Sequence, residues 1–227
     1  MKKYFGILTL LLVTLISRAD STNATFTTTL SGGGLAIPDA NPVGITSTLD
    51  VSGMTGVTTN ITVNLDITGG FSGDLYAYLI SPTGTMVVLV NRTGINSGNY
   101  FGYSDAGFNV TFDSSSTTNI HNYQSGSYTL SGGGQLTGTL ATDSRAISPT
   151  ATPSAFNASP TGNTLVNYDG FSPDGTWTLF VADLSGGGQS TLVSWGLSVV
   201  TVPEPQTWTI FSGGLAACWL MIRRQRK

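Results

Sequence analysis

Apolar and polar residues alternate along several short segments of this chain. A period of two places the apolar side chains on one face of a strand, which is then buried on that side only. The clearest segments are 61–67, 176–182 and 193–199. The side chains that we expect to face inwards are Ile61, Val63, Leu65 and Ile67; Trp177, Leu179 and Val181; and Val193, Trp195, Leu197 and Val199.

Clusters of Gly, Pro, Asn and Asp separate these segments from further expected strands. Between the two chain ends, no segment keeps a 3.6-residue period over ten residues, so long helices are not expected. The further strands are expected at 46–51, 75–80, 85–90, 108–112, 127–130 and 164–168, and the longest loops at 96–107 and 143–163. Roughly eight to ten short strands predict an all-β fold, an antiparallel jelly-roll sandwich of two packed sheets.

The first residues have the pattern of a secretory signal peptide. Lys2 and Lys3 precede an apolar stretch over 4–16, and small residues stand at Ser17 and Ala19. The alternative, a retained anchor, is disfavoured because about 13 apolar residues are too few to cross a hydrocarbon layer of roughly 30 Å. We therefore expect export and cleavage after Ala19.

The chain ends in an apolar run over 208–222, followed by four basic residues within the last five. As a helix this run would reach about 22 Å, which is a marginal membrane span. The basic end would stay on the cytoplasmic side, since positive flanks resist translocation. The expected arrangement is a brief tether at the C-terminus with the body outside.

Val202-Pro203-Glu204-Pro205, the short apolar run and the Arg-rich end together resemble the PEP-CTERM sorting signal of Gram-negative bacteria. The resemblance covers residues 203–227 and implies that an exosortase in the inner membrane removes the tail. The product would reach the cell surface or the extracellular matrix. A glycolipid-anchor signal is the nearest rival, but such signals end in the apolar run.

Removal of both ends changes the charge of the protein. Residues 20–202 keep two Arg and eleven Asp, with no Lys and no Glu, so the net charge is near −9. This excludes a basic surface for nucleic acid and favours cations as partners. The single cysteine, Cys218, lies in the tail. The body therefore forms no internal disulfide, and its core or bound ions must stabilise it.

Five short motifs of the body resemble the P domain, also called P/Homo B, of proprotein convertases. They are Gly73-Asp74-Leu75, Ser81-Pro82-Thr83-Gly84, Phe112-Asp113, Gly175-Thr176-Trp177-Thr178-Leu179 and Trp195-Gly196-Leu197. The resemblance covers about residues 20–202 and implies a β jelly roll that stabilises a neighbouring subtilisin-like protease. The chain departs from the family pattern at Ser114, where a second Asp is common, and at Gly69 and Gly70.

The sequence does not favour catalysis. A Ser-His-Asp triad needs a His that accepts the Ser proton, and the one His of the chain, His121, lies outside any subtilase motif. We expect a non-catalytic surface or matrix protein. The alternatives are an accessory domain of a partner subtilisin-like protease and a carbohydrate-binding adhesin, for which Tyr76, Tyr78, Tyr100, Phe101 and Tyr103 would supply aromatic faces.

Calcium is the candidate cofactor, because hard oxygen ligands from several loops can converge at one end of a jelly roll. Each of the candidate ligands stands beside a turn or a strand end, inside a family-like motif. They are Asp39, Asp74, Asp113 and Asp183. The alternative is that these carboxylates cap turns by accepting bonds from nearby backbone N–H groups.

Overall fold

The computed structural model describes residues 21–28 and 30–203, which form one compact unit. The predicted signal peptide, the membrane run 208–222, Cys218 and the basic end all lie outside the described residues. Within the described ranges, no helix is long and apolar enough to cross a membrane.

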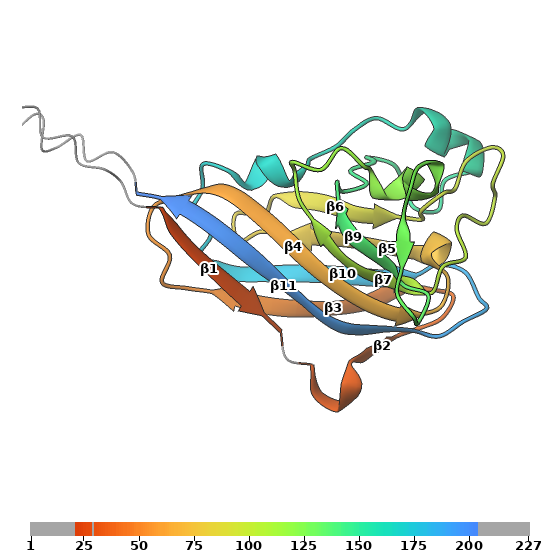
Figure 1. Cartoon of the computed structure of the whole chain (residues 1–227), viewed down its shortest axis with the longest axis horizontal. Helices are drawn as coiled ribbons and strands as arrows, with labels where there is room; N and C mark the ends of the chain where they lie inside the picture. Colours follow the sequence, from red (N-terminus) through yellow and green to blue (C-terminus); the bar gives the residue numbers. More distant parts are fainter. Residues whose placement is uncertain (1–20, 29, 204–227) are drawn as a thin grey trace, which may run out of the picture. The chain divides into compact units, whose positions relative to one another are not determined.

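Strands dominate the described part of the chain and form two sheets. They are β1 (Thr22–Thr27), β2 (Leu35–Ile37), β3 (Asn41–Val51), β4 (Val57–Gly69), β5 (Leu75–Ile80), β6 (Met86–Asn91), β7 (Gly107–Phe112), β8 (Thr129–Leu130), β9 (Leu136–Leu140), β10 (Gly175–Asp183) and β11 (Ser190–Val202). The larger sheet has the order β1-β11-β4-β7-β9-β8, with β2 also paired to β11, and the smaller one has the order β3-β10-β5-β6 (Figure 1). The two-sheet β architecture is therefore confirmed.

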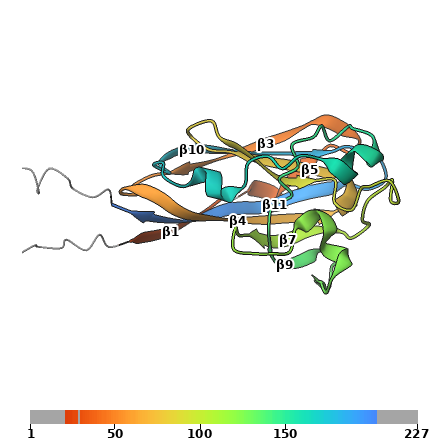
Figure 2. The same cartoon turned by 90° about the horizontal axis from the view of Figure 1, so that it is seen from above.

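The helical elements are short 3₁₀ turns in the connections. They are η1 (Ser31–Gly33), η2 (Ser72–Asp74), η3 (Ile120–Ser125), η4 (Pro153–Ala158) and η5 (Leu165–Tyr168). Figure 2 shows β3, β5 and β10 in one layer and β1, β4, β7 and β9 in the other. The core lies between these layers.

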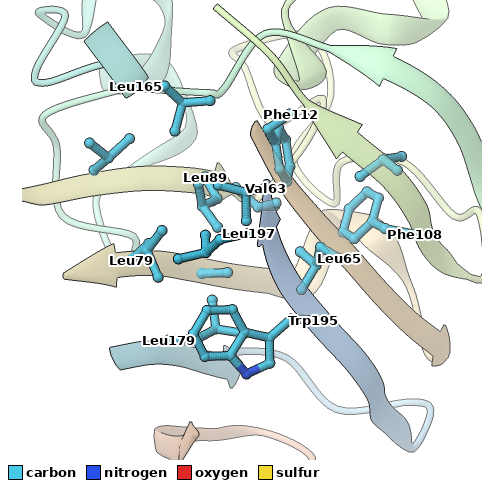
Figure 3. Close-up of a cluster of buried hydrophobic side chains, with 14 of the residues drawn as sticks. Val63, Leu65, Leu79, Leu89, Phe108, Phe112, Leu165, Leu179, Trp195 and Leu197 are labelled. Atoms are coloured by element: carbon cyan, nitrogen blue, oxygen red, sulfur yellow. The ribbon is translucent and has the colours of Figure 1, made fainter. Parts of the chain in front are cut away.

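The inner faces carry the side chains that the alternation predicts. The four apolar residues of β4 that were predicted to face inwards are each at most 1% exposed, and Trp177, Leu179 and Val181 of β10 are buried to the same degree. Leu179 from the small sheet and Trp195 and Leu197 from the large sheet meet in one cluster (Figure 3). The indole Nε1 of Trp195 also donates to Oγ of Ser47 on β3 at 2.9 Å, so a hydrogen bond joins the sheets.

The alternation fails once, at the start of β11. The pairing of β11 with β4 shifts register between Leu192 and Ser194, which marks a β-bulge. An extra residue at a bulge reverses the inward phase of the residues before it. Leu192 is therefore fully buried and Val193 only half-buried, so the inward placement predicted for Val193 is wrong.

Two further predictions are corrected. The predicted strand 164–168 is instead the 3₁₀ helix η5 with Thr164 as its N-cap, because Leu165 and Tyr168, three residues apart, both turn into the core. The backbone N–H of Thr164 donates to the Asn167 side chain at 2.8 Å and holds this turn. The sheets are also not wholly antiparallel, since β7 and β9 pair in parallel.

The connection between β9 and β10 crosses the edge of the small sheet. The backbone N–H groups of Asp143 and Ser144 donate to the carbonyl oxygens of Leu89 and Val88, each at 3.0 Å. These bonds satisfy carbonyl groups on the outer side of β6, which a free edge strand would leave unpaired. The connection is thus part of the framework.

Candidate functional site

Three connections meet at the end of the sandwich where β4 ends and β5 begins. The N–H groups of Ser72 and Gly73 donate to the carbonyl oxygens of Asp105 and Tyr103, at 2.9 and 2.8 Å. The N–H of Leu184 donates to the carbonyl oxygen of Asp74 at 2.9 Å. Backbone bonds therefore tie the turn before β5 to the loops that follow β6 and β10.

A glycine is required at the centre of this junction. A Cβ atom on Gly73 would lie 2.5 Å from the carbonyl oxygen of Phe101 and 2.8 Å from Cα of Gly102. No side chain fits at such distances, so the Gly-Asp-Leu motif follows from close packing of two backbones. The same packing fixes where the next residue, Asp74, projects.

The structure brings three of the four predicted acidic residues together. Asp183 pairs with Leu75, the neighbour of Asp74, and Oδ2 of Asp39 accepts a bond from the N–H of Gly187 in the loop after β10. Burial is the main cause of the raised pKa of Asp183, and charge repulsion from Asp74 and Asp39 adds to it, so all three lie within electrostatic reach. This acidic cluster consists of Asp39, Asp74 and Asp183.

Asp113 does not belong to the acidic cluster. Gly107, at the start of β7, packs against the Gly69 end of β4, and Asp113 follows the opposite end of β7. Five residues of strand separate the ends by roughly 17 Å. The carboxylate of Asp113 accepts a bond from the N–H of Ser115 at 2.8 Å, as a turn-capping Asp does. Asp113 therefore stands apart from the other three candidate ligands, and its role in ion binding stays a prediction.

Arg92 places a positive charge beside the acidic cluster. Its Nη2 lies 3.9 Å from Oδ1 of Asp74, while Nε and Nη2 donate to the carbonyl of Gly73 and to Oγ of Ser185 at 3.3 and 3.1 Å. Burial raises the pKa of Asp74, and the Ser185 hydroxyl and Arg92 offset part of that rise. Burial also raises the pKa of Asp183 to about 6.

No metal centre is ready-made in the described part of the chain. Among residues 21–28 and 30–203, no group of three or more His, Cys, Asp or Glu side chains could hold a metal ion. Arg92 already places a positive charge beside Asp74 and Asp183. Calcium binding remains a prediction from the sequence.

A cleft of about 350 Å³ opens next to the acidic cluster. Aromatic side chains and one carboxylate dominate its lining, which comprises Phe71, Asp74, Phe101, Gly102, Tyr103, Ser104, Ser185 and Gly186. Phe101 is 85% exposed and Phe71 is 40% exposed, so neither ring serves the core. Exposed aromatic rings that gather around a hollow are typical of a binding surface.

Tyr76 and Tyr78 lie away from the cleft, whereas Tyr103 lines it. On the small sheet, the ring of Tyr78 stacks on Phe180 with centroids 4.7 Å apart, and Tyr76 packs against both. In the loop after β6, the ring of Tyr103 meets that of Tyr123 edge-on at 4.8 Å. The candidate aromatic residues thus form two groups with different contacts.

His121 is held in a buried polar network. Its Nδ1 lies 2.8 Å from Oδ2 of Asp143, and its Nε2 lies 2.9 Å from the carbonyl oxygen of Ile95. Oδ1 of Asp143 accepts a bond from Nη1 of Arg145 at 2.9 Å, and Oδ2 also accepts from the N–H of Asn91. The ring of His121 is 1% exposed, so both nitrogens are engaged away from solvent.

The sequence did not reveal this network. His121 and Asp143 stand 22 residues apart, and no motif links them. One signal was available: an Asp and an Arg in "TDSRAI" are the charged residues of a long polar segment, and isolated charges of that kind are frequently paired. The sequence also gave no reason to place Arg92 against Asp74.

Comparison with known proteins gives a partial family match. Residues 58–131 match the model of the proprotein convertase P-domain. This match begins within β4 and ends one residue after β8. It includes the motifs at 73–75, 81–84 and 112–113. The motifs at 175–179 and 195–197 lie outside the matched residues. No match is found among curated proteins.

Two solved structures are similar to this chain. One is the serine protease of Aeromonas sobria, with 14% sequence identity, a TM-score of 0.43, and coverage of 80% of this chain and 27% of that chain. The other is the complex of that protease with its chaperone, with 15% identity, a TM-score of 0.43, and coverage of 82% and 28%. The chain thus spans less than a third of the length of these solved chains.

Proposed function

We propose that this chain is a non-catalytic, exported binding module, built on a jelly roll of the P-domain type. The family match at 58–131 supports the P-domain relationship. The state of His121 carries the non-catalytic part, because the chain has no other His. A general base must present a free ring nitrogen to the serine hydroxyl. Both nitrogens of His121 are bonded to other acceptors inside the protein.

The destination that we propose is the cell surface or extracellular matrix of a Gram-negative bacterium. The N-terminal signal and the PEP-CTERM-like end of the sequence support export and trimming by an exosortase. The net charge near −9 of residues 20–202 suits a protein that stays soluble and repels acidic polymers.

Intact-mass analysis of the protein isolated from its native host tests this destination. The mature chain is expected to begin after Ala19 and to lack Cys218 together with the basic end. Material on the cell surface that still carries Arg223 to Lys227 would show a retained anchor and contradict the sorting proposal.

An accessory role for a partner subtilisin-like protease is the second candidate. The match to a domain that belongs to proprotein convertases favours it. A neighbouring gene for a subtilase that lacks such a domain would support this role, whereas neighbouring genes for polysaccharide synthesis would support the matrix role. Calcium remains a proposal for the acidic cluster alone, because Asp113 lies at the other end of β7.

A further inference from the structure

The cleft between Phe71 and Phe101 is rigidly built. Gly102 has φ +74°, and a Cβ there would lie 2.4 Å from the carbonyl oxygen of Thr93. The side chain of Asn99 accepts from the N–H of Gly102 and donates to its carbonyl oxygen, at 3.1 and 3.0 Å. The backbone next to Phe101 is therefore fixed before any ligand arrives.

Negative charge is in excess at the acidic cluster, of which Asp74 lines the cleft. The acidic cluster supplies three carboxylates, and Arg92 is the one cation beside them in the described part of the chain. Asp183 is 1% exposed, so it adds negative charge near the cleft but cannot contact a ligand there. Asp74 lines the cleft itself, and its carboxylate lies 3.9 Å from Arg92, which is beyond hydrogen-bond distance.

The nearest hydrogen-bond donors to that carboxylate are already engaged, since the Ser185 hydroxyl bonds Asp74 itself. The guanidinium of Arg92 is committed to the carbonyl of Gly73 and to Ser185. A neutral sugar needs several donors and acceptors around an aromatic face, whereas a cation on an apolar stem needs a carboxylate and aromatic faces. The chemistry of the cleft favours the second kind of ligand.

We propose that this cleft receives a lysine side chain presented by a partner protein. The ammonium group binds the carboxylate of Asp74, and the methylene groups lie against the rings of Phe71 and Phe101. A bare metal ion would leave the exposed rings unused. The proposal rests on the binding role proposed above and names its partner chemistry.

A fluorescein-labelled peptide, Gly-Leu-Lys-Leu-Gly, tests the proposal by fluorescence polarisation with the full chain in 50 mM NaCl and EDTA. EDTA removes calcium, which would compete for Asp74. The lysine peptide is expected to bind, and the same peptide with norleucine at the central position is expected to bind at least tenfold more weakly. Asp74→Asn and Phe101→Ala should each weaken binding of the lysine peptide by at least fivefold.

Matched controls separate the cleft from general charge and hydrophobicity. Tyr100→Ala removes an exposed ring that does not line the cleft, and Asp50→Asn removes an exposed carboxylate on β3. Neither should change binding more than twofold. Phe101→Ala should leave the melting temperature unchanged, so it reports on binding even if Asp74→Asn impairs folding.

Equal binding of the lysine and norleucine peptides would overturn the proposal, as would lysine binding that survives both cleft substitutions. Binding of a neutral oligosaccharide that is lost in Phe101→Ala, with no lysine binding, would overturn it in favour of a glycan. These outcomes leave the catalytic question untouched, because none of them depends on whether the protein hydrolyses a substrate.

Discussion

Nδ1 of His121 lies 2.8 Å from a carboxylate oxygen of Asp143, and Nε2 lies 2.9 Å from a backbone carbonyl oxygen. Both neighbours are hydrogen-bond acceptors. The ring ties the loop at Ile95 to Asp143 in the connection after β9, and Arg145 donates to the other carboxylate oxygen of Asp143.

Replacement of His121 by Ala should therefore destabilise the fold strongly. The change removes a hydrogen-bond partner from the buried carboxylate of Asp143 and leaves the carbonyl of Ile95 without its partner, which costs about 3 kcal/mol when the group is charged. Urea unfolding of the variant measures this loss. A double-mutant cycle with Asp143→Ala should show that the two losses are not additive. A loss of less than about 0.5 kcal/mol, in the range of surface substitutions, would contradict a structural role for this buried network.

Ser47→Ala should cost about 2 kcal/mol, because it leaves the buried indole N–H of Trp195 without its acceptor. Thr46→Ala, at the adjacent exposed position of β3, is the matched control and should be nearly neutral. Chemical denaturation of both variants provides the comparison. Equal effects would show that the hydrogen bond between the sheets does not matter.

Lowering the pH should remove the free-energy cost of burying the ionised carboxylate of Asp183. Its pKa is about 6 in the folded protein and about 3.8 in the unfolded chain. Because the folded state binds this proton more tightly, the carboxylate destabilises the fold above pH 6, and the penalty disappears as the pH falls towards 4. Asp183→Asn should therefore raise the melting temperature at pH 7.5 and change it little at pH 4.

The difference between wild type and Asp183→Asn isolates this residue from the other carboxylates, and calorimetry at several pH values supplies it. Asp50→Asn, at an exposed position, should show no such trend. A variant less stable than wild type at pH 7.5 would mean that the ionised carboxylate of Asp183 stabilises the fold.

Calcium, as the sequence predicts, should raise the melting temperature more than NaCl at equal ionic strength, and Asp74→Asn should abolish most of that gain. The structure adds that Asp113→Asn should leave the gain unchanged, since Asp113 stands apart from the acidic cluster. Thermal melts in both salts decide the matter. Indistinguishable curves would contradict calcium binding.

The sequence was informative where burial imposes a simple period. The alternation in β4 and β10 predicted the inward residues because each strand has one buried face. It failed where the backbone departs from regular geometry, as at the bulge beside Val193 and at the 3₁₀ turn η5. β1 was missed because Thr and Asn fill most of its positions, and β9 because a glycine interrupts five residues.

The candidate site was predictable only in part. The motif around Asp74 is local and readable, and Asp183 stands at a strand end. Pairing between distant segments is a different matter, because strand order and loop paths decide which residues meet. For this reason neither the approach of Arg92 to Asp74 nor the partners of His121 could be inferred from the sequence. For the same reason the sequence groups Asp113 with Asp39, Asp74 and Asp183, although these three lie near the opposite end of β7.

The most direct test of the non-catalytic role combines peptide hydrolysis with covalent labelling. The purified full chain is incubated with a mixed peptide substrate and, separately, with a fluorophosphonate probe that labels activated serines; His121→Gln serves as the comparison. We predict no hydrolysis above background and no labelled serine in either protein. Hydrolysis or labelling by the wild type that disappears in His121→Gln would contradict the account.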